Sequence, residues 1–225
     1  MQFTYLAVLA FTLSYPLYKS FEEKINYVSK WKYLWPAIFI SAIIFIGWDI
    51  WFTSMGVWGF DKAHVLGFFL AGLPIEEWLF FFIVPFSCVF IYEVLNYFVR
   101  KDVLGKAAKY ISFLLVFLLF LIGGQHIYRF HTSITFFSLG FFLLLHQFVL
   151  RTPYMGRYYL CWAVCMVPFL LVNGVLTAAP VICYNNLHIL NIRIYTIPVE
   201  DVFYGMLQIL MVITFYEYFK KKSNG

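Results

Sequence analysis

Two pairs of acidic residues stand at matching places in the sequence, and each pair could carry out proton chemistry. Residues 73–77 (LPIEE) recur 124 positions later as residues 197–201 (IPVED), and a long apolar run follows each copy. A carboxylic acid in apolar surroundings, with a second acid beside it, tends to keep its proton and can donate it. The pattern is also a good helix start, because proline suits the first position and acids offset the helix dipole.

The similarity extends well beyond these acids. Residues 49–93 overlie residues 173–217 at the same offset without a gap. Apolar matches mean little in so apolar a chain, so the polar matches carry the inference of an internal duplication. They are Thr53 with Thr177, His64 with His188, Glu76 with Glu200, and Tyr92-Glu93 with Tyr216-Glu217.

Composition places the chain in a membrane. Hydrophobic residues make up 63% of it, against about 45–50% in soluble domains, and the mean hydropathy is +0.82. Seven stretches approach or exceed the roughly 17 apolar residues that a span needs, of which the first and fourth are short. The first lacks the basic start and cleavage site of a signal peptide. We therefore predict an all-α polytopic membrane protein with seven transmembrane helices. They are expected at residues 3–18, 34–53, 75–99, 110–124, 134–150, 158–178 and 198–219.

The basic residues predict an orientation. If the chain crosses seven times, thirteen of its sixteen Lys and Arg residues fall on one side, and only Lys62, Arg129 and Arg193 on the other. Because basic residues collect in cytoplasmic loops, we expect the cytoplasmic (plasma) membrane, with the N-terminus outside and the C-terminus in the cytoplasm. The net charge of +5 then reflects topology and contact with anionic membrane lipid, and gives no reason to propose nucleic acid.

The repeat and the crossings together predict a 3+1+3 arrangement. Residues 1–100 would form a first three-helix unit, residues 101–130 a connecting transmembrane helix, and residues 131–225 a second unit. Units separated by an even number of crossings share one orientation and are related by an axis along the membrane normal. Both acidic motifs are thus expected at the same non-cytoplasmic level, where the third and seventh helices begin.

More polar residues are expected beside these motifs. Seven of the eleven acids lie in or at the ends of apolar spans, where an exposed charge costs on the order of 2.5–3.5 kcal/mol at the bilayer centre, so they should face the interior. Asp49 and Thr53 share one helix face, as do Asn173 and Thr177, which predicts a polar chamber under the outer surface. Four residues about 25 Å further along are instead expected to pair with basic residues: Tyr92, Glu93, Tyr216 and Glu217.

The outer connections, residues 54–73 and 178–197, are themselves largely apolar. Such segments are expected to lie in the interface or to fold back over the bundle, as a lid for a lipid-soluble substrate. His64 and His188 stand at matching places on them as candidate proton relays, although an interfacial histidine is an equally good interpretation.

Motifs for other chemistries are absent. The sequence has no GxGxxG after a strand, no GxxxxGK[ST], no HExxH and no DDxxD, so we expect no cofactor and no metal. What remains is carboxylic acids, some histidines and hydroxyls, and aromatic rings. Tryptophans beside a cavity could stabilise a carbocation through cation–π attraction, although most are expected to pack or to line the interface. The candidates are Trp48, Trp51, Trp58 and Trp78.

These features resemble the membrane-integral lycopene cyclases, in which two homologous three-helix units form a heterodimer or are fused in one chain. The resemblance rests on the duplicated Pro-x-Glu-[Glu/Asp] segments, each after a helix with a paired polar face, and it covers nearly the whole chain. It implies redox-neutral cyclisation of lycopene or a related linear carotenoid. An end-group double bond is protonated, the neighbouring double bond attacks the cation, and loss of a ring proton gives a β-ring.

The resemblance also implies roles for the acids. Glu76 or Glu200 would be the general acid, and Glu77, Asp201 or Asp49 would tune it or accept the proton. Asp201 departs from the Glu-Glu form and Asp49 faces an asparagine in the repeat, so the halves are not expected to contribute equally. Supporting or substrate-binding residues would be Asn173, Thr53, Thr177, His64, His188, Trp48 and Trp78.

Other functions remain open at this point. A SWEET-type transporter has a similar 3+1+3 arrangement, but Pro16, Pro36 and Pro168 have no partners at the repeat offset to act as matched hinges. A retinal-binding pump needs a lysine within the last helix, and residues 198–219 contain none. A related enzyme acting on carotenoid end groups and a homo-oligomeric assembly are further alternatives.

Overall fold

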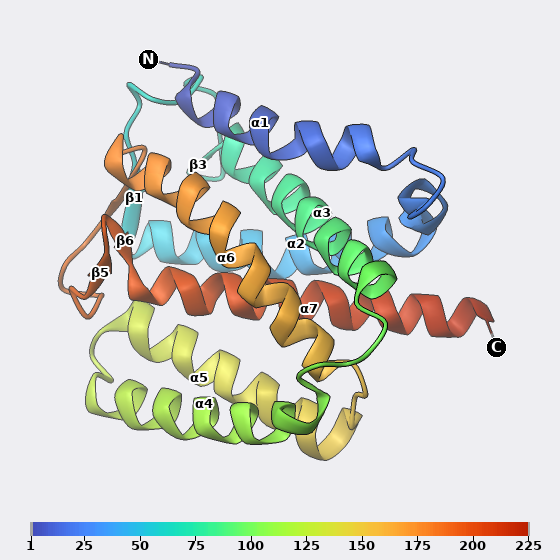
Figure 1. The fold of residues 1–225 in the computed structure, drawn as a ribbon. Coiled ribbons are helices and arrows are strands. Elements are labelled where there is room, and N and C mark those ends of the chain that lie inside the picture. The colour runs from blue at the N-terminus through green and yellow to red at the C-terminus, as the bar shows by residue number, and fades with distance from the viewer. Residues whose placement is uncertain (1, 225) are drawn as a thin grey trace.

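The computed structural model describes residues 2–224 and is all-α, as predicted, with seven long helices (Figure 1). Six of them are long and apolar enough to cross a membrane, whereas α1 has only 16 residues. A 3-10 turn (Tyr27–Lys30) precedes α2, and a π-turn (His146–Leu150) follows α5. The helices are α1 (Thr4–Lys19), α2 (Trp31–Ser54), α3 (Ile75–Phe98), α4 (Gly105–Gln125), α5 (Phe130–Leu145), α6 (Met155–Ala178) and α7 (Val199–Asn224).

Several helices extend beyond the predicted apolar stretches at the end rich in basic residues. Helix α4 begins at Gly105 and includes Lys106 and Lys109, although the predicted span starts at residue 110. Helix α7 likewise continues through the lysines that follow Phe219. Charged side chains end an apolar stretch but not a helix, because a long lysine side chain can reach the interface from within the last turn.

Short strands, which the sequence did not predict, form in the outer connections. Strand β1 (Trp58–Phe60) pairs antiparallel with β4 (Ile182–Tyr184), and this pair joins the two halves of the chain. Two small hairpins precede the acidic motifs, β2 (Phe69–Leu70) with β3 (Leu73–Pro74), and β5 (Arg193–Ile194) with β6 (Ile197–Pro198). All three strands of the first connection recur in the second at the repeat offset of 124.

The two connections also share their backbone bends. Gly67 and Ala71 have positive φ angles of 85° and 51°, and their counterparts Asn191 and Tyr195 have 63° and 59°. Glycine and asparagine tolerate this left-handed conformation best. Both connections fold back over the end of the bundle at which α3 and α7 begin, and residues of β1 and β4 line the cavity described below.

The helices of the two halves are packed against one another. Helix α2 contacts α7, and α3 contacts α6, while α1 lies along α3 and α5 along α7 (Figure 1). Helix α4 packs mainly on α5, at the side of the bundle. Since the second helix of each half packs on the third helix of the other, the space between α3, α6 and α7 is built jointly by both halves.

A reciprocal pair of hydrogen bonds joins the C-terminal parts of α3 and α7. Tyr92 donates to Glu217 at 3.0 Å, and Tyr216 donates to Glu93 at 2.7 Å. Glu93 also pairs with two lysines, Lys30 at 2.5 Å and Lys220 at 3.0 Å. The expected pairing with basic side chains is thus confirmed for Glu93 and Glu217, whereas Tyr92 and Tyr216 donate hydrogen bonds to these two glutamates.

The burial of Glu93 predicts unequal effects at the two matching glutamates. Its side chain is 3% exposed, against 23% for Glu217. Glu93→Ala leaves the buried Tyr216 hydroxyl without an acceptor, so we expect it to lower the free energy of unfolding by about 1–3 kcal/mol. Glu217→Ala is the matched control, with a smaller effect expected. Thermal unfolding in detergent measures both, and equal shifts in midpoint would contradict this account.

Candidate active site

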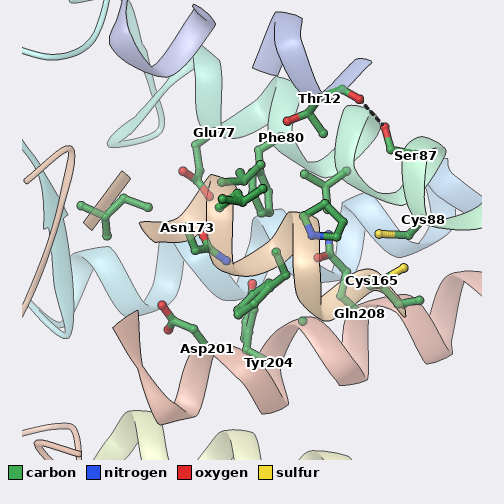
Figure 2. A pocket seen from close by; sticks show the side chains of 18 of the residues that line it. Thr12, Glu77, Phe80, Ser87, Cys88, Cys165, Asn173, Asp201, Tyr204 and Gln208 are labelled. Carbon is green, nitrogen blue, oxygen red and sulfur yellow. Dashed lines mark hydrogen bonds between the residues drawn. The ribbon is translucent and has the colours of Figure 1, made fainter. Parts of the chain in front are cut away.

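A cavity of about 380 Å³ lies between α1, α3, α6 and α7, with β1 and β4 across its outer end (Figure 2). Most of its surface is apolar. Most of its polar side chains divide into two groups, one at each end, and Thr12, Ser14 and Tyr15 of α1 also line it. The inner group is Ser87, Cys88, Cys165 and Gln208, and the outer group is Asp49, Glu77, His131, Asn173, Tyr184, Asp201 and Tyr204.

Helical geometry explains which acid of each motif reaches this cavity. Both motifs begin helices, and their acids lie in the first turns of α3 and α7. Adjacent helical residues point about 100° apart, so the two acids of a motif cannot face the same way. Glu77 lies on the face of α3 that also lines the cavity through Phe80 and Val84, at spacings of three and four residues.

The first group of cavity acids joins α2 and α3. The carboxyl groups of Asp49 and Glu77 lie within hydrogen-bonding reach of each other. Each also accepts a phenol hydrogen bond, Glu77 from Tyr5 at 2.6 Å and Asp49 from Tyr204 at 2.7 Å. Asp49 is 3% exposed and Glu77 is 5% exposed, so these two acids meet in surroundings with little water.

The second group surrounds Asp201 on α7. His131, at the start of α5, places Nε2 at 3.0 Å from Asp201 Oδ1, and its Nδ1 lies at 3.1 Å from Thr135 Oγ1. An ionised Asp201 can only accept, and it then requires the His131 proton on Nε2 for this bond. Tyr184 of β4 donates to Asp201 Oδ2 at 2.6 Å. Burial and the neighbouring Asp201 carboxylate raise the pKa of Tyr184 well above its usual value, so the phenol remains a donor.

The first acids of the motifs, Glu76 and Glu200, do not line the cavity. Glu76 Oε1 accepts the backbone N–H of Leu66 at 2.7 Å, and Glu200 Oε1 accepts that of Leu190 at 2.6 Å. Leu66 and Leu190 are repeat counterparts, so each glutamate holds its own outer connection in the same way. Glu200 also accepts the Thr132 hydroxyl, and the second carboxylate oxygen of both glutamates is buried without a partner among the described residues.

Of the polar residues predicted on α2 and α6 to support the acids, only Asn173 lines the cavity. Its amide points into the space between Glu77 and Asp201 (Figure 2). Thr177 instead shares a hydrogen bond with Thr196 at 2.6 Å and donates to its own helix. Thr53 does not line the cavity, and its buried hydroxyl has no partner among the described residues.

The other predicted supporting residues lie outside the cavity. His64 is in a turn with Asp61, at 3.2 Å, where the Ala63 N–H lowers the pKa of Asp61. The His188 ring packs on Phe130, while its carbonyl accepts the N–H of His131 at 3.0 Å and so supports the site through the backbone. Among the tryptophans only Trp58 and Trp162 line the cavity. Trp48 stacks on Phe45 behind it, and Trp78 donates to Leu70 O.

Four residues of the site did not emerge from the sequence: Tyr5, His131, Tyr184 and Tyr204. One available signal was the repeat itself, since Tyr184 corresponds to Phe60 and Tyr204 to Phe80. Phe60, Phe80, Tyr184 and Tyr204 all line the cavity. The two halves therefore differ there by the hydroxyl groups of the two tyrosines. His131 corresponds to Ala7 and marks the same kind of difference.

Comparison with known proteins agrees with this architecture. The sequence matches the family described as Lycopene cyclase over residues 2–95 and 128–219. Comparisons with curated proteins and with solved structures gave no match. The two matched stretches fall on either side of α4 and cover most of the sequence. With six candidate membrane spans and a buried, acid-lined apolar cavity, the chain belongs to the lycopene cyclase family of carotenoid cyclases.

Proposed function

We propose that the protein forms β-rings at the ends of lycopene by a proton-initiated, redox-neutral reaction. The observation that carries this proposal is the meeting of three carboxyl groups, Asp49, Glu77 and Asp201, at one end of an otherwise apolar cavity. Such a cavity accepts a hydrocarbon, and carboxyl groups are the proton donors and acceptors that cyclisation requires. No redox cofactor is needed, since one proton enters and one leaves.

The proton donor in this proposal is the Asp49–Glu77 pair. Two carboxyl groups in contact and away from water hold a proton between them, because two adjacent negative charges repel. Tyr5 donates a hydrogen bond to Glu77 Oε2 and Tyr204 donates one to Asp49 Oδ1, and these bonds fix both carboxyl groups in place. Transfer of this proton to the terminal double bond leaves a cation, which the neighbouring double bond attacks to close a six-membered ring.

Asp201 is the proposed proton acceptor. Two donors, His131 and Tyr184, bind its two oxygens and stabilise it as a carboxylate. The β-ring arises when the cyclic cation loses the ring proton next to the polyene chain. Asn173, between Glu77 and Asp201, is positioned to hold a water through which the proton returns to the donor pair.

Aromatic side chains complete the proposed mechanism. Trp58, Phe80 and Tyr204 line the cavity beside the acids, and the faces of such rings attract a carbocation. The β1–β4 pair covers this end of the cavity, and Trp58 itself is 8% exposed. Exclusion of water prevents hydration of the cation, which would give an alcohol in place of a ring.

Family membership favours this reaction over the SWEET-type transporter and the retinal-binding pump. We further propose the orientation that the basic residues favour, with the acidic motifs near the outer surface and the C-terminus in the cytoplasm. The proposed units are residues 1–100 and 131–225, joined by residues 101–130.

The reaction and its donor are tested together in cells that accumulate lycopene. The wild type is expected to convert lycopene to cyclic product, measured by pigment chromatography. Glu77→Gln, which keeps the shape but removes the acid, is expected to lower the rate by about 10²–10⁴-fold. Glu76→Gln is the matched control from the same motif, with a smaller loss expected. Full activity of Glu77→Gln, or unchanged lycopene with wild-type protein verified in the membrane, would refute the proposal.

The acceptor is tested at Asp201 and His131. Asp201→Asn is expected to lose about 10²–10⁴-fold in rate. His131→Gln retains an N–H donor and should keep more activity than His131→Ala, because the donor positions Asp201. His64→Ala, in a turn outside the cavity, is expected to match the wild type. Initial rates in isolated membranes measure all four, and equal rates for the two His131 variants would exclude the positioning role.

Reporter fusions test the orientation. A green fluorescent protein fused after residue 225 is expected to fluoresce, and alkaline phosphatase at the same place to be inactive, because the latter folds only outside the cytoplasm. The opposite pattern would reverse the proposed topology.

A further inference from the structure

The cavity reaches the outside of the protein between α1 and α6. Among its lining residues, those classed as exposed are all on these two helices: Phe11, Ser14, Tyr15 and Leu171. Phe11 is 73% exposed, Tyr15 is 63% exposed and Leu171 is 62% exposed. Helices α1 and α6 contact each other, and α1 lies over α3 and α6 in the fold (Figure 1). The cavity is therefore open sideways rather than at its end.

The level of this opening is set by helix geometry. Phe11 lies seven residues after the first residue of α1, and Leu171 lies seven before the last residue of α6. At 1.5 Å per residue, both are about 10 Å from the outer ends of their helices. In a hydrocarbon core about 30 Å thick, an opening at this depth faces lipid chains and not water.

The outer end of the cavity is closed. Strands β1 and β4 cross it through Trp58, Phe60, Ile182 and Tyr184, and the glutamates Glu76 and Glu200 hold the connections that carry these strands. The carboxyl groups lie at this closed end, whereas the sideways opening lies deeper in the membrane. A substrate must therefore pass the opening before it meets an acid.

We propose that a linear carotenoid enters end-first from the bilayer core through the opening between α1 and α6, and that each entry cyclises one end only. This inference rests on the proposed function. Acids occupy only the outer end of the cavity. Ligand pockets have volumes of about 300–1,000 Å³, and the volume of this cavity is near the lower end of that range. The two ends of lycopene are separated by the whole polyene. The unreacted end consequently stays in the inner cavity or in the lipid, and a monocyclic product leaves before the second end enters.

The entry route is tested by narrowing the opening. Leu171→Trp fills it from α6, and Val167→Trp places the same side chain one turn away, at a residue 65% exposed that does not line the cavity. Leu171→Trp is expected to lower the initial rate about tenfold or more, because the end group no longer reaches the acids in a reactive position. Val167→Trp is expected to match the wild type. Both are compared at equal membrane content.

A second pair of variants, on α1, repeats the test from the other side of the opening. The result then does not depend on whether a single variant folds. Phe11→Trp narrows the opening from α1, and Tyr18→Trp changes a residue 76% exposed that lies outside the cavity lining. The same contrast in rate is expected. Wild-type rates for both Leu171→Trp and Phe11→Trp would overturn the route while leaving the proposed function intact. An inactive wild type would instead refute the proposed function.

Isotope dilution tests the separate cyclisation of the two ends. Labelled lycopene is supplied to active membranes together with an excess of unlabelled monocyclic carotene. If the monocyclic product leaves between the two reactions, label accumulates in the monocyclic pool and the bicyclic product is strongly diluted. A final product with a single ring would equally support one end per entry. Bicyclic product at the full specific activity of the lycopene would overturn the inference.

Discussion

The burial of carboxyl groups in a membrane protein is the constraint on which this structure depends. A charged or half-satisfied acid in a low-dielectric interior is costly, so each acid must be bound or must share a proton. The protein meets this requirement in two ways. Glu76 and Glu200 accept backbone N–H groups from the outer connections, whereas Asp49, Glu77 and Asp201 are bound by side chains around the cavity. The first set holds the outer connections in place, and the second set lines the cavity.

The contacts of the two repeat halves fall into the same two sets. Contacts that recur in both halves are structural, such as the glutamate-held connections and the reciprocal Tyr–Glu bonds of α3 and α7. The contacts that bind Asp201 at the cavity occur in one half only. His131 and Tyr184 bind Asp201, and no histidine takes that part beside Glu77. The halves thus differ where a reaction needs a donor and an acceptor of unlike character.

The sequence predicted the helical membrane fold, the repeat and the level at which the acids gather, because these follow from apolar length and matched polar positions. It did not predict which acid of a motif faces the cavity. That depends on the rotation of α3 and α7 about their axes, which the packing of α2, α6 and the outer strands sets. The four partners Tyr5, His131, Tyr184 and Tyr204 come from four separate elements, so local spacing could not group them.

The register of β1 against β4 has a consequence for how such a site can arise. Trp58 pairs with Tyr184, Gly59 with Cys183 and Phe60 with Ile182. Because β4 is the repeat counterpart of β1, each strand pairs antiparallel with its own counterpart. Two identical subunits about a two-fold axis make this kind of self-pairing contact. In such a dimer every substitution appears twice and the two sites remain identical. Once α4 joins the halves in one chain, a substitution alters one side alone, and a Phe-to-Tyr change can create a hydrogen-bonded acid on one side of the cavity only.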